Sequence, residues 1–327
     1  MDRAKLPRRD FLKGVSAATA GLALSSVLPA EASGGGVPRR KFGRANEEVS
    51  IIGVGGHTLA TTASEAESIR MVHEAINAGV NFMDNAWEYH DGRGEEVMGK
   101  GLKGWRDRVF LATKVCTHGK DRKVAMRMLE ESLHRLQTDH LDLWSIHAIA
   151  SDEEIAAAFA PGGVVEALDE ARKQGKTRYV GFTGHTSPKF HLAMLAHGYH
   201  FDAVLMPLNA FEPERRGFRA EVLPQLNQQG IAALGMKSLG GDARMVREGK
   251  LTAEQGLRFA LSLPITSLMV GMKSLDNLRA NLKTVQNFKP MSPSEMEALT
   301  TRFAGLINST DRFCHYQLPG YRDGEQV

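Results

Sequence analysis

Beginning near residue 49, short apolar runs alternate with longer segments in which apolar residues recur at helical spacing. The short runs predict strands. They cover residues 49–54, 80–84, 109–114, 141–147, 179–183, 203–206, 231–236 and 265–270. The longer segments, most of them amphipathic, predict helices. These cover residues 64–78, 95–102, 122–136, 164–174, 188–196, 221–229, 252–262 and 275–284, with one more from 293 to about 308.

Eight strands, each followed by a helix, are in the order of a (β/α)8 TIM barrel, an α/β fold of about 250 residues. An open doubly wound sheet shows the same alternation, but it usually has G-x-G-x-x-G after its first strand. Residues 53–57 read GVGGH and lack that spacing. The sequence therefore predicts one barrel, followed by an extra C-terminal helix and a polar tail.

The first residues have the composition of an export signal. Residues 8–13 read RRDFLK, a weakly apolar stretch follows at 14–28, and AEA stands at 30–32. This order is typical of a secretory signal peptide. The paired Arg8 and Arg9 resemble signals of the twin-arginine (Tat) pathway, which implies a cargo exported already folded. We expect a Tat signal peptide over 1–32, a linker over 33–41 and the barrel domain over 42–327. The expected location is periplasmic or extracellular, with the Tat export machinery as a partner.

The net charge of the chain argues against some classes of binding partner. The chain has 41 Lys and Arg against 38 Asp and Glu, and loss of residues 1–32 would leave it almost neutral. Neutrality argues against a nucleic-acid or anionic-membrane partner, because both favour a basic surface. The apolar part of the signal is shorter than the about 20 apolar residues of a membrane helix, so no stable membrane anchor is expected.

Four titratable side chains fall at or just after the ends of three consecutive predicted strands. Asp84 ends the second strand, Lys114 the third and His147 the fourth, while Tyr89 stands five residues beyond Asp84. Each alone has an ordinary structural explanation. Barrels of this kind, however, place their chemistry at the strand ends. Burying a lysine and an aspartate together is costly unless they pair, so a paired functional use is favoured.

The segments around these residues resemble the aldo-keto reductase family. NFMDNAWEY at 81–89 resembles the signature around the family's Asp and Tyr, LATKV at 111–115 its lysine strand, and LDLWSIH at 141–147 its histidine strand. The resemblance runs from about residue 42 to 308. It implies an NAD(P)H-dependent reductase of aldehydes and ketones, or the reverse oxidation of an alcohol or sugar, by hydride transfer on a (β/α)8 barrel.

The resemblance also implies roles for the four residues. Tyr89 would be the general acid that protonates the carbonyl oxygen. Lys114 would lower the pKa of Tyr89, because a nearby cation favours the phenolate. Asp84 would hold and neutralise Lys114, and His147 would bind and orient the substrate oxygen by a hydrogen bond.

A repeated pentapeptide points to a nucleotide cofactor. GMKSL occurs at 235–239 and at 271–275, at the ends of the seventh and eighth predicted strands. Barrels commonly bind phosphate there, and Gly, Lys and Ser supply close backbone approach, charge and a hydroxyl. By resemblance, the cofactor-binding residues are Thr183, Gly184, Met236, Lys237, Ser238, Leu239, Gly271, Lys273, Asn277 and Asn281. Lys273 would take the 2′-phosphate, so NADPH is expected rather than NADH.

The substrate pocket is less well defined, because loops vary on this scaffold. Trp87, His118, Ala148 and Phe211 are expected to line a pocket for a small-molecule carbonyl or sugar substrate. A nucleotide-binding redox sensor of the same fold, with little turnover, is the alternative function.

Two other possibilities concern metal and disulfide chemistry. No metal is expected, because metal-dependent barrel hydrolases carry His-x-His after the first strand and only His57 stands there. Two cysteines are too few for a disulfide scaffold. Cys116 either lines the barrel mouth beside Lys114 or pairs with Cys314, and the sequence leaves both open.

Overall fold

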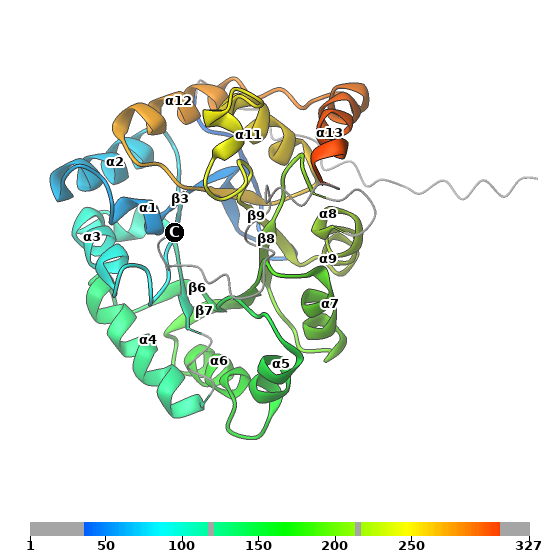
Figure 1. Ribbon diagram of the computed structural model, residues 1–327. Coiled ribbons are helices and arrows are strands. Elements are labelled where there is room, and N and C mark those ends of the chain that lie inside the picture. Colours follow the sequence, from blue (N-terminus) through cyan, green and yellow to red (C-terminus); the bar gives the residue numbers. More distant parts are fainter. Residues whose placement is uncertain (1–35, 117–120, 213–216, 308–327) are drawn as a thin grey trace, which may run out of the picture.

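The structure, a computed structural model, describes residues 36–116, 121–212 and 217–307. Eight parallel strands close into a barrel in the order β10-β3-β4-β5-β6-β7-β8-β9. Helices surround it on the outside (Figure 1). The predicted α/β barrel is therefore confirmed. The predicted signal peptide, residues 33–35 of the linker, His118, and the polar tail with Cys314 lie outside the described residues.

Each predicted strand is present with slightly different ends. The barrel strands are β3 (Ile52–Gly55), β4 (Phe82–Asp84), β5 (Phe110–Val115), β6 (Leu141–Ile146), β7 (Thr177–Thr183), β8 (Ala203–Pro207), β9 (Ala232–Met236) and β10 (Ser267–Val270). The strand predicted at 49–54 is two strands, because the chain changes partner at Ile51. Before that residue, β2 (Glu48–Ser50) pairs with β1 (Arg39–Lys41), outside the barrel.

The predicted helices are also present. They are α2 (Glu65–Asn77), α3 (Arg93–Leu102), α4 (Arg122–Leu136), α6 (Val164–Lys173), α7 (Pro188–Ala196), α9 (Leu223–Gln229), α11 (Ala253–Ser262), α12 (Leu275–Gln286) and α13 (Pro293–Ile307). The sequence pattern missed short helices in the loops: α1 (Gly56–Leu59), α5 (Asp152–Phe159), α8 (Phe218–Glu221), α10 (Arg244–Arg247) and a 3-10 turn at Arg106–Arg108. Among the described residues, no helix is both long and apolar enough to cross a membrane.

Side-chain caps fix where several helices begin. The hydroxyl of Ser64 accepts from the Glu67 amide at the start of α2, at 3.1 Å. Ser274 accepts from the Asn277 amide at the start of α12, at 3.2 Å. These oxygens satisfy amides that the first helical turn leaves without partners. The cap on α12 matters for the site, because only residues 271–274 separate this helix from the end of β10.

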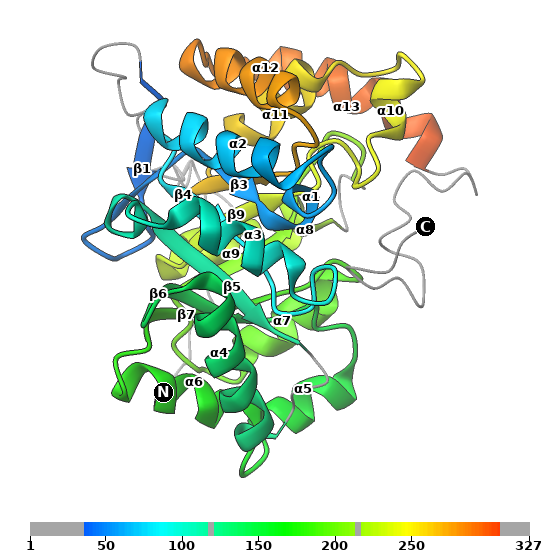
Figure 2. The same cartoon turned by 90° about the vertical axis from the view of Figure 1, so that its left-hand side faces the viewer.

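The β1–β2 hairpin lies at the amino end of the barrel (Figure 2). Phe42, which follows β1, packs against Phe110 and Tyr179 with ring centroids 4.7 and 5.2 Å apart. The linker predicted at 33–41 is therefore wrong for its last three residues. Their sequence, RRK, has no apolar strand pattern, and pairing with β2 together with burial of Phe42 holds them in place.

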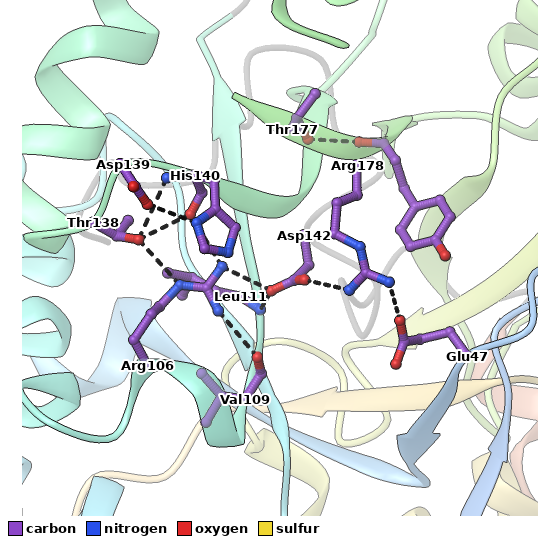
Figure 3. Close-up of polar contacts among 11 residues, drawn as sticks. Glu47, Arg106, Val109, Leu111, Thr138, Asp139, His140, Asp142, Thr177 and Arg178 are labelled. Atoms are coloured by element: carbon purple, nitrogen blue, oxygen red, sulfur yellow. Dashed lines mark hydrogen bonds and ion pairs between the residues drawn. The ribbon is translucent and has the colours of Figure 1, made fainter. Parts of the chain in front are cut away.

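A charge cluster at the same end ties the hairpin to the barrel (Figure 3). Asp142 in β6 accepts hydrogen bonds from Arg106 at 2.9 Å, from the Leu111 amide at 2.8 Å and from Arg178 at 2.8 Å. Arg178 also contacts Glu47 of the hairpin. The cluster lies at the amino ends of the strands, away from the predicted site, so its contacts join β5, β6, β7 and the hairpin.

Candidate active site

The ends of β4, β5 and β6 bring the four predicted residues together. Lys114 Nζ lies 2.8 Å from Asp84 Oδ2 and donates to the carbonyl oxygen of Asn85 at 2.5 Å. The same Nζ lies 5.0 Å from the centroid of the Tyr89 ring. The His147 ring meets the Tyr89 ring edge-on, with centroids 5.6 Å apart. All four residues are buried, so these charges interact in a largely water-excluded mouth.

Close backbone packing holds the loop that carries Tyr89. Asn85 Nδ2 donates to the carbonyl oxygen of Gly94 at 2.8 Å, and the Trp87 amide donates to the Lys114 carbonyl at 3.1 Å. A Cβ on Gly56 would lie 2.3 Å from Asn85 Nδ2, so only glycine lets α1 approach this loop without displacing the Asn85 side chain. Tyr89 is therefore positioned by contacts on both sides of its loop.

Glu88 is a site residue that the sequence analysis missed. Its Oε1 lies 2.5 Å from His147 Nδ1, and its Oε2 accepts from the Cys116 thiol at 2.8 Å. Cys116 is buried next to this carboxylate, as expected for a residue lining the mouth; the alternative pairing with Cys314 is untested, because Cys314 is not described. The only signal in the sequence was the position of Glu88 beside Tyr89, and a loop has no periodicity from which its direction can be derived.

Two further histidines lie beside Tyr89. The His57 ring lies 5.1 Å from the Tyr89 ring and 4.6 Å from the His90 ring, centroid to centroid. His90 has φ +52°, in the left-handed region that residues other than glycine seldom adopt. Within the described part of the chain, no cluster of three or more His, Cys, Asp or Glu side chains is arranged to hold a metal ion.

The first GMKSL copy ends β9, and the second follows β10, its paired neighbour. Met236 is the last residue of β9, and Lys237 after it has φ +55°. Ser238 is buried, and Leu239 packs so closely on α11 that a Cβ on Gly256 would lie 2.4 Å from Leu239 Cδ2. The two copies thus lie at the same end of adjacent strands.

The second copy leads into the amino terminus of α12. Gly271 follows β10, and a Cβ there would lie 2.9 Å from Thr58 Cγ2. Lys273 and Asn277 are exposed at the start of the helix, where Asn277 Oδ1 accepts from the Lys273 amide at 3.3 Å. Asn281 is buried one turn further on. A lysine and the positive end of a helix suit an anionic group.

The end of β7 carries Thr183 and Gly184, two of the predicted cofactor-binding residues. The Thr183 hydroxyl accepts from the Ala148 amide at 2.9 Å. A Cβ on Gly184 would lie 2.7 Å from His191 Cε1, so the glycine allows β7 to pack closely against α7. Burial lowers the pKa of His191 to about 4, so its ring is neutral at physiological pH.

Two of the predicted substrate-pocket residues, Trp87 and Phe211, contact outer helices. The Trp87 indole donates to Glu131 of α4 at 2.8 Å, and Arg135 of α4 lies over its ring at 5.2 Å. Phe211 is fully buried against Phe303 of α13, with ring centroids 5.6 Å apart. Both rings belong to loops that fold back onto the outer helices. Ala148 directly follows His147 and has φ +53°.

Comparison with known proteins decides the family. The profile of the "Aldo/keto reductase family" matches residues 51–255. The chain belongs to this family. It is therefore an oxidoreductase of a family that uses NAD(P)H. L-galactose dehydrogenase of Arabidopsis thaliana is 26% identical over 303 residues, 80% of this chain and 93% of that protein. Methylglyoxal reductase YeaE of Escherichia coli is 30% identical over 207 residues, 62% of this chain and 69% of that protein.

Solved structures show the same fold. The holo form of aldo-keto reductase AKR11C1 from Bacillus halodurans superposes with a TM-score of 0.65 at 22% identity. The match covers 81% of this chain and 95% of that one.

Proposed function

We propose that this protein is an NADPH-dependent reductase of aldehydes or ketones, or in reverse an NADP⁺-dependent dehydrogenase of the corresponding alcohol or sugar, with Tyr89 as general acid. The observation that carries the proposal is the position of Lys114. Its ammonium group lies 5.0 Å from the Tyr89 ring centroid and is paired with Asp84 at 2.8 Å. A buried cation beside a phenol favours its ionised form, which makes the hydroxyl a better acid near neutral pH.

In the proposed reaction, one group donates a hydride and another donates a proton. NADPH, when bound, supplies the hydride to the carbonyl carbon. The Tyr89 hydroxyl gives its proton to the carbonyl oxygen, and Lys114 stabilises the phenolate that is left. His147, buried beside the Tyr89 ring, donates a hydrogen bond to the same oxygen and thereby orients the substrate.

The residues at the carboxyl ends of β9 and β10 fit such a dinucleotide. Lys237 and Ser238 of the first GMKSL copy would hold the diphosphate, with Met236 at the nicotinamide ring. Lys273 and the amino terminus of α12 would take the 2′-phosphate, with Asn281 at the adenine. NADPH is preferred because a cation at a helix amino terminus favours the extra phosphate.

A small polar substrate is favoured over a large apolar one. His57, His90 and Glu88 surround Tyr89 with hydrogen-bonding groups. Two relatives are named for methylglyoxal and L-galactose, both small and polar. The test is NADPH consumption with a panel of 2-oxoaldehydes, sugars and apolar ketones, together with NADP⁺ reduction by the matching alcohols. Turnover confined to small polar compounds supports the proposal, and absence of turnover with every carbonyl would overturn it.

The proposed location follows from the amino-terminal sequence. Residues 1–32 resemble a Tat signal peptide, and the Tat pathway exports folded proteins. We infer that the enzyme binds its nucleotide in the cytoplasm and carries it across the membrane to the periplasm. A ligand that binds only the native state would also stabilise the cargo before export, by about 2.7 kcal/mol at a hundredfold excess over Kd.

A further inference from the structure

A second acid–base pair lies beside Tyr89, in addition to Asp84 and Lys114. Glu88 contacts His147 Nδ1 through Oε1, at 2.5 Å, and Cys116 through Oε2, at 2.8 Å. The His147 side chain is 1% exposed and that of Glu88 23%. Groups from the ends of β5 and β6 therefore engage both carboxylate oxygens, which fixes Glu88 even though it stands in a loop.

The balance of charge indicates which protonation state suits this pair. Lys114 and Asp84 cancel each other, and Glu88 adds one further negative charge. With a neutral His147, these described groups would carry a net negative charge next to the substrate oxygen, which itself becomes negative during reduction. A protonated imidazole removes that charge and pairs the carboxylate, which is otherwise costly to hold largely out of water.

We propose that Glu88 is a positioning residue that holds His147 as an imidazolium, an inference that rests on the proposed reductase function. An Nδ1 paired with a carboxylate carries a proton, so Nε2 can donate to the substrate oxygen only when the ring holds two protons. The imidazolium then makes a charge-assisted hydrogen bond to the oxygen while Tyr89 protonates it. Tyr89 thus stands beside two ion pairs, Lys114 with Asp84 and His147 with Glu88.

Other titratable groups face this pair. The Tyr89 ring lies 5.6 Å from the His147 ring, centroid to centroid. The His57 ring lies 5.1 Å from the Tyr89 ring. The Lys114 cation disfavours a positive charge on His147, but Asp84, 2.8 Å from the Lys114 ammonium, offsets this effect. The Cys116 thiol donates to Glu88. Among the described residues, Glu88 is thus an anion in direct contact with the imidazole.

The test uses Glu88→Gln as a single substitution in the protein without residues 1–32. ¹⁵N-histidine NMR follows the titration of His147, whose signals are assigned by their loss in His147→Asn. Steady-state kinetics with NADPH and a substrate found in the carbonyl panel give the pH profile of kcat/KM. Asp91→Asn is the matched control, because it removes an exposed carboxylate of the same loop at a backbone conformation that asparagine tolerates.

We expect Glu88→Gln to move the titration midpoint of His147 to lower pH by about one unit, because the pairing charge is lost. The alkaline limb of kcat/KM should move in the same direction by a similar amount, with Asp91→Asn changing neither. An unchanged His147 midpoint in Glu88→Gln would overturn the inference, even if activity fell. The NMR result does not depend on turnover, so a shifted midpoint in a protein that reduces no carbonyl would contradict the proposed function and leave the ion pair standing.

Discussion

Lys114 and Asp84 form a 2.8 Å ion pair across β5 and β4, with only 2% of the lysine side chain exposed. The pair does two things at once. It places a cation 5.0 Å from the centroid of the Tyr89 ring, and it compensates a charge that could not otherwise be buried at the barrel mouth. Activity and stability should therefore respond together when it is broken.

Lys114→Met should abolish reduction and lower the free energy of unfolding by about 3–5 kcal/mol, because Asp84 loses its buried partner. Urea denaturation measures the stability and NADPH consumption the activity. Lys189→Met is the control, since Lys189 pairs with Asp152 in an exposed position where an ion pair contributes less than about 1 kcal/mol. Equal stability of the two variants would contradict the account of the buried pair.

Lys273→Ala tests the cofactor assignment. Loss of a charge-assisted contact should weaken NADPH binding by about 1–2 kcal/mol, or roughly tenfold, with little effect on NADH. Lys283→Ala removes an exposed lysine from the other end of α12 and should change neither affinity. Calorimetric titration with both nucleotides makes the comparison. Equal wild-type affinity for NADPH and NADH would refute the stated preference.

Glu212 provides a pH-dependent test of the core. Burial raises the pKa of its carboxyl from 4.5 to about 8. Between these values the unfolded carboxyl is ionised and the folded one is protonated, so unfolding releases a proton and this contribution to stability is lost as pH rises. Relative to Glu212→Gln, the wild type should lose up to about 1.4 kcal/mol per pH unit in that window.

Urea denaturation of both proteins at several pH values checks this slope. The exposed Glu297→Gln should follow the wild type throughout. Parallel pH profiles for wild type and Glu212→Gln would show that Glu212 does not titrate between its two expected values.

The export proposal predicts the behaviour of a signal variant. Replacing Arg8 and Arg9 together by Lys should leave full-length protein in the cytoplasm, because the twin-arginine pattern is lost. Fractionation and immunoblotting of a Tat-competent bacterium measure the distribution. Nucleotide extracted from the periplasmic wild-type protein would support loading before export, whereas export of a nucleotide-free protein would refute it.

Much of the fold could be predicted because its signals are local. The eight barrel strands are short apolar runs between amphipathic helices, and the strand ends are where Asp84, Lys114 and His147 come together. The β1 strand escaped prediction because Arg39–Lys41 is held by its hairpin partner, Glu48–Ser50, and not by an apolar pattern of its own. Pairing of a polar segment with a neighbouring strand leaves no trace in its periodicity.

Loop side chains could not be placed for a related reason. Trp87 and Glu88 are neighbours, yet the indole contacts α4 while the carboxylate contacts His147. Phe211 likewise packs on Phe303, far away in the sequence. The direction of such side chains depends on irregular backbone angles and on their eventual partners, so the sequence identified Tyr89 by resemblance but could not identify Glu88.

The most direct test of the central claim is Tyr89→Phe, measured by single-turnover oxidation of bound NADPH with a carbonyl that the wild type reduces. The substitution removes only the hydroxyl, which acts in the transition state, so binding of NADPH should be nearly unchanged. The rate of hydride transfer should fall by about 10²–10⁴-fold, the usual contribution of a general acid. A variant that transfers hydride at the wild-type rate would contradict the assignment of Tyr89 as the acid.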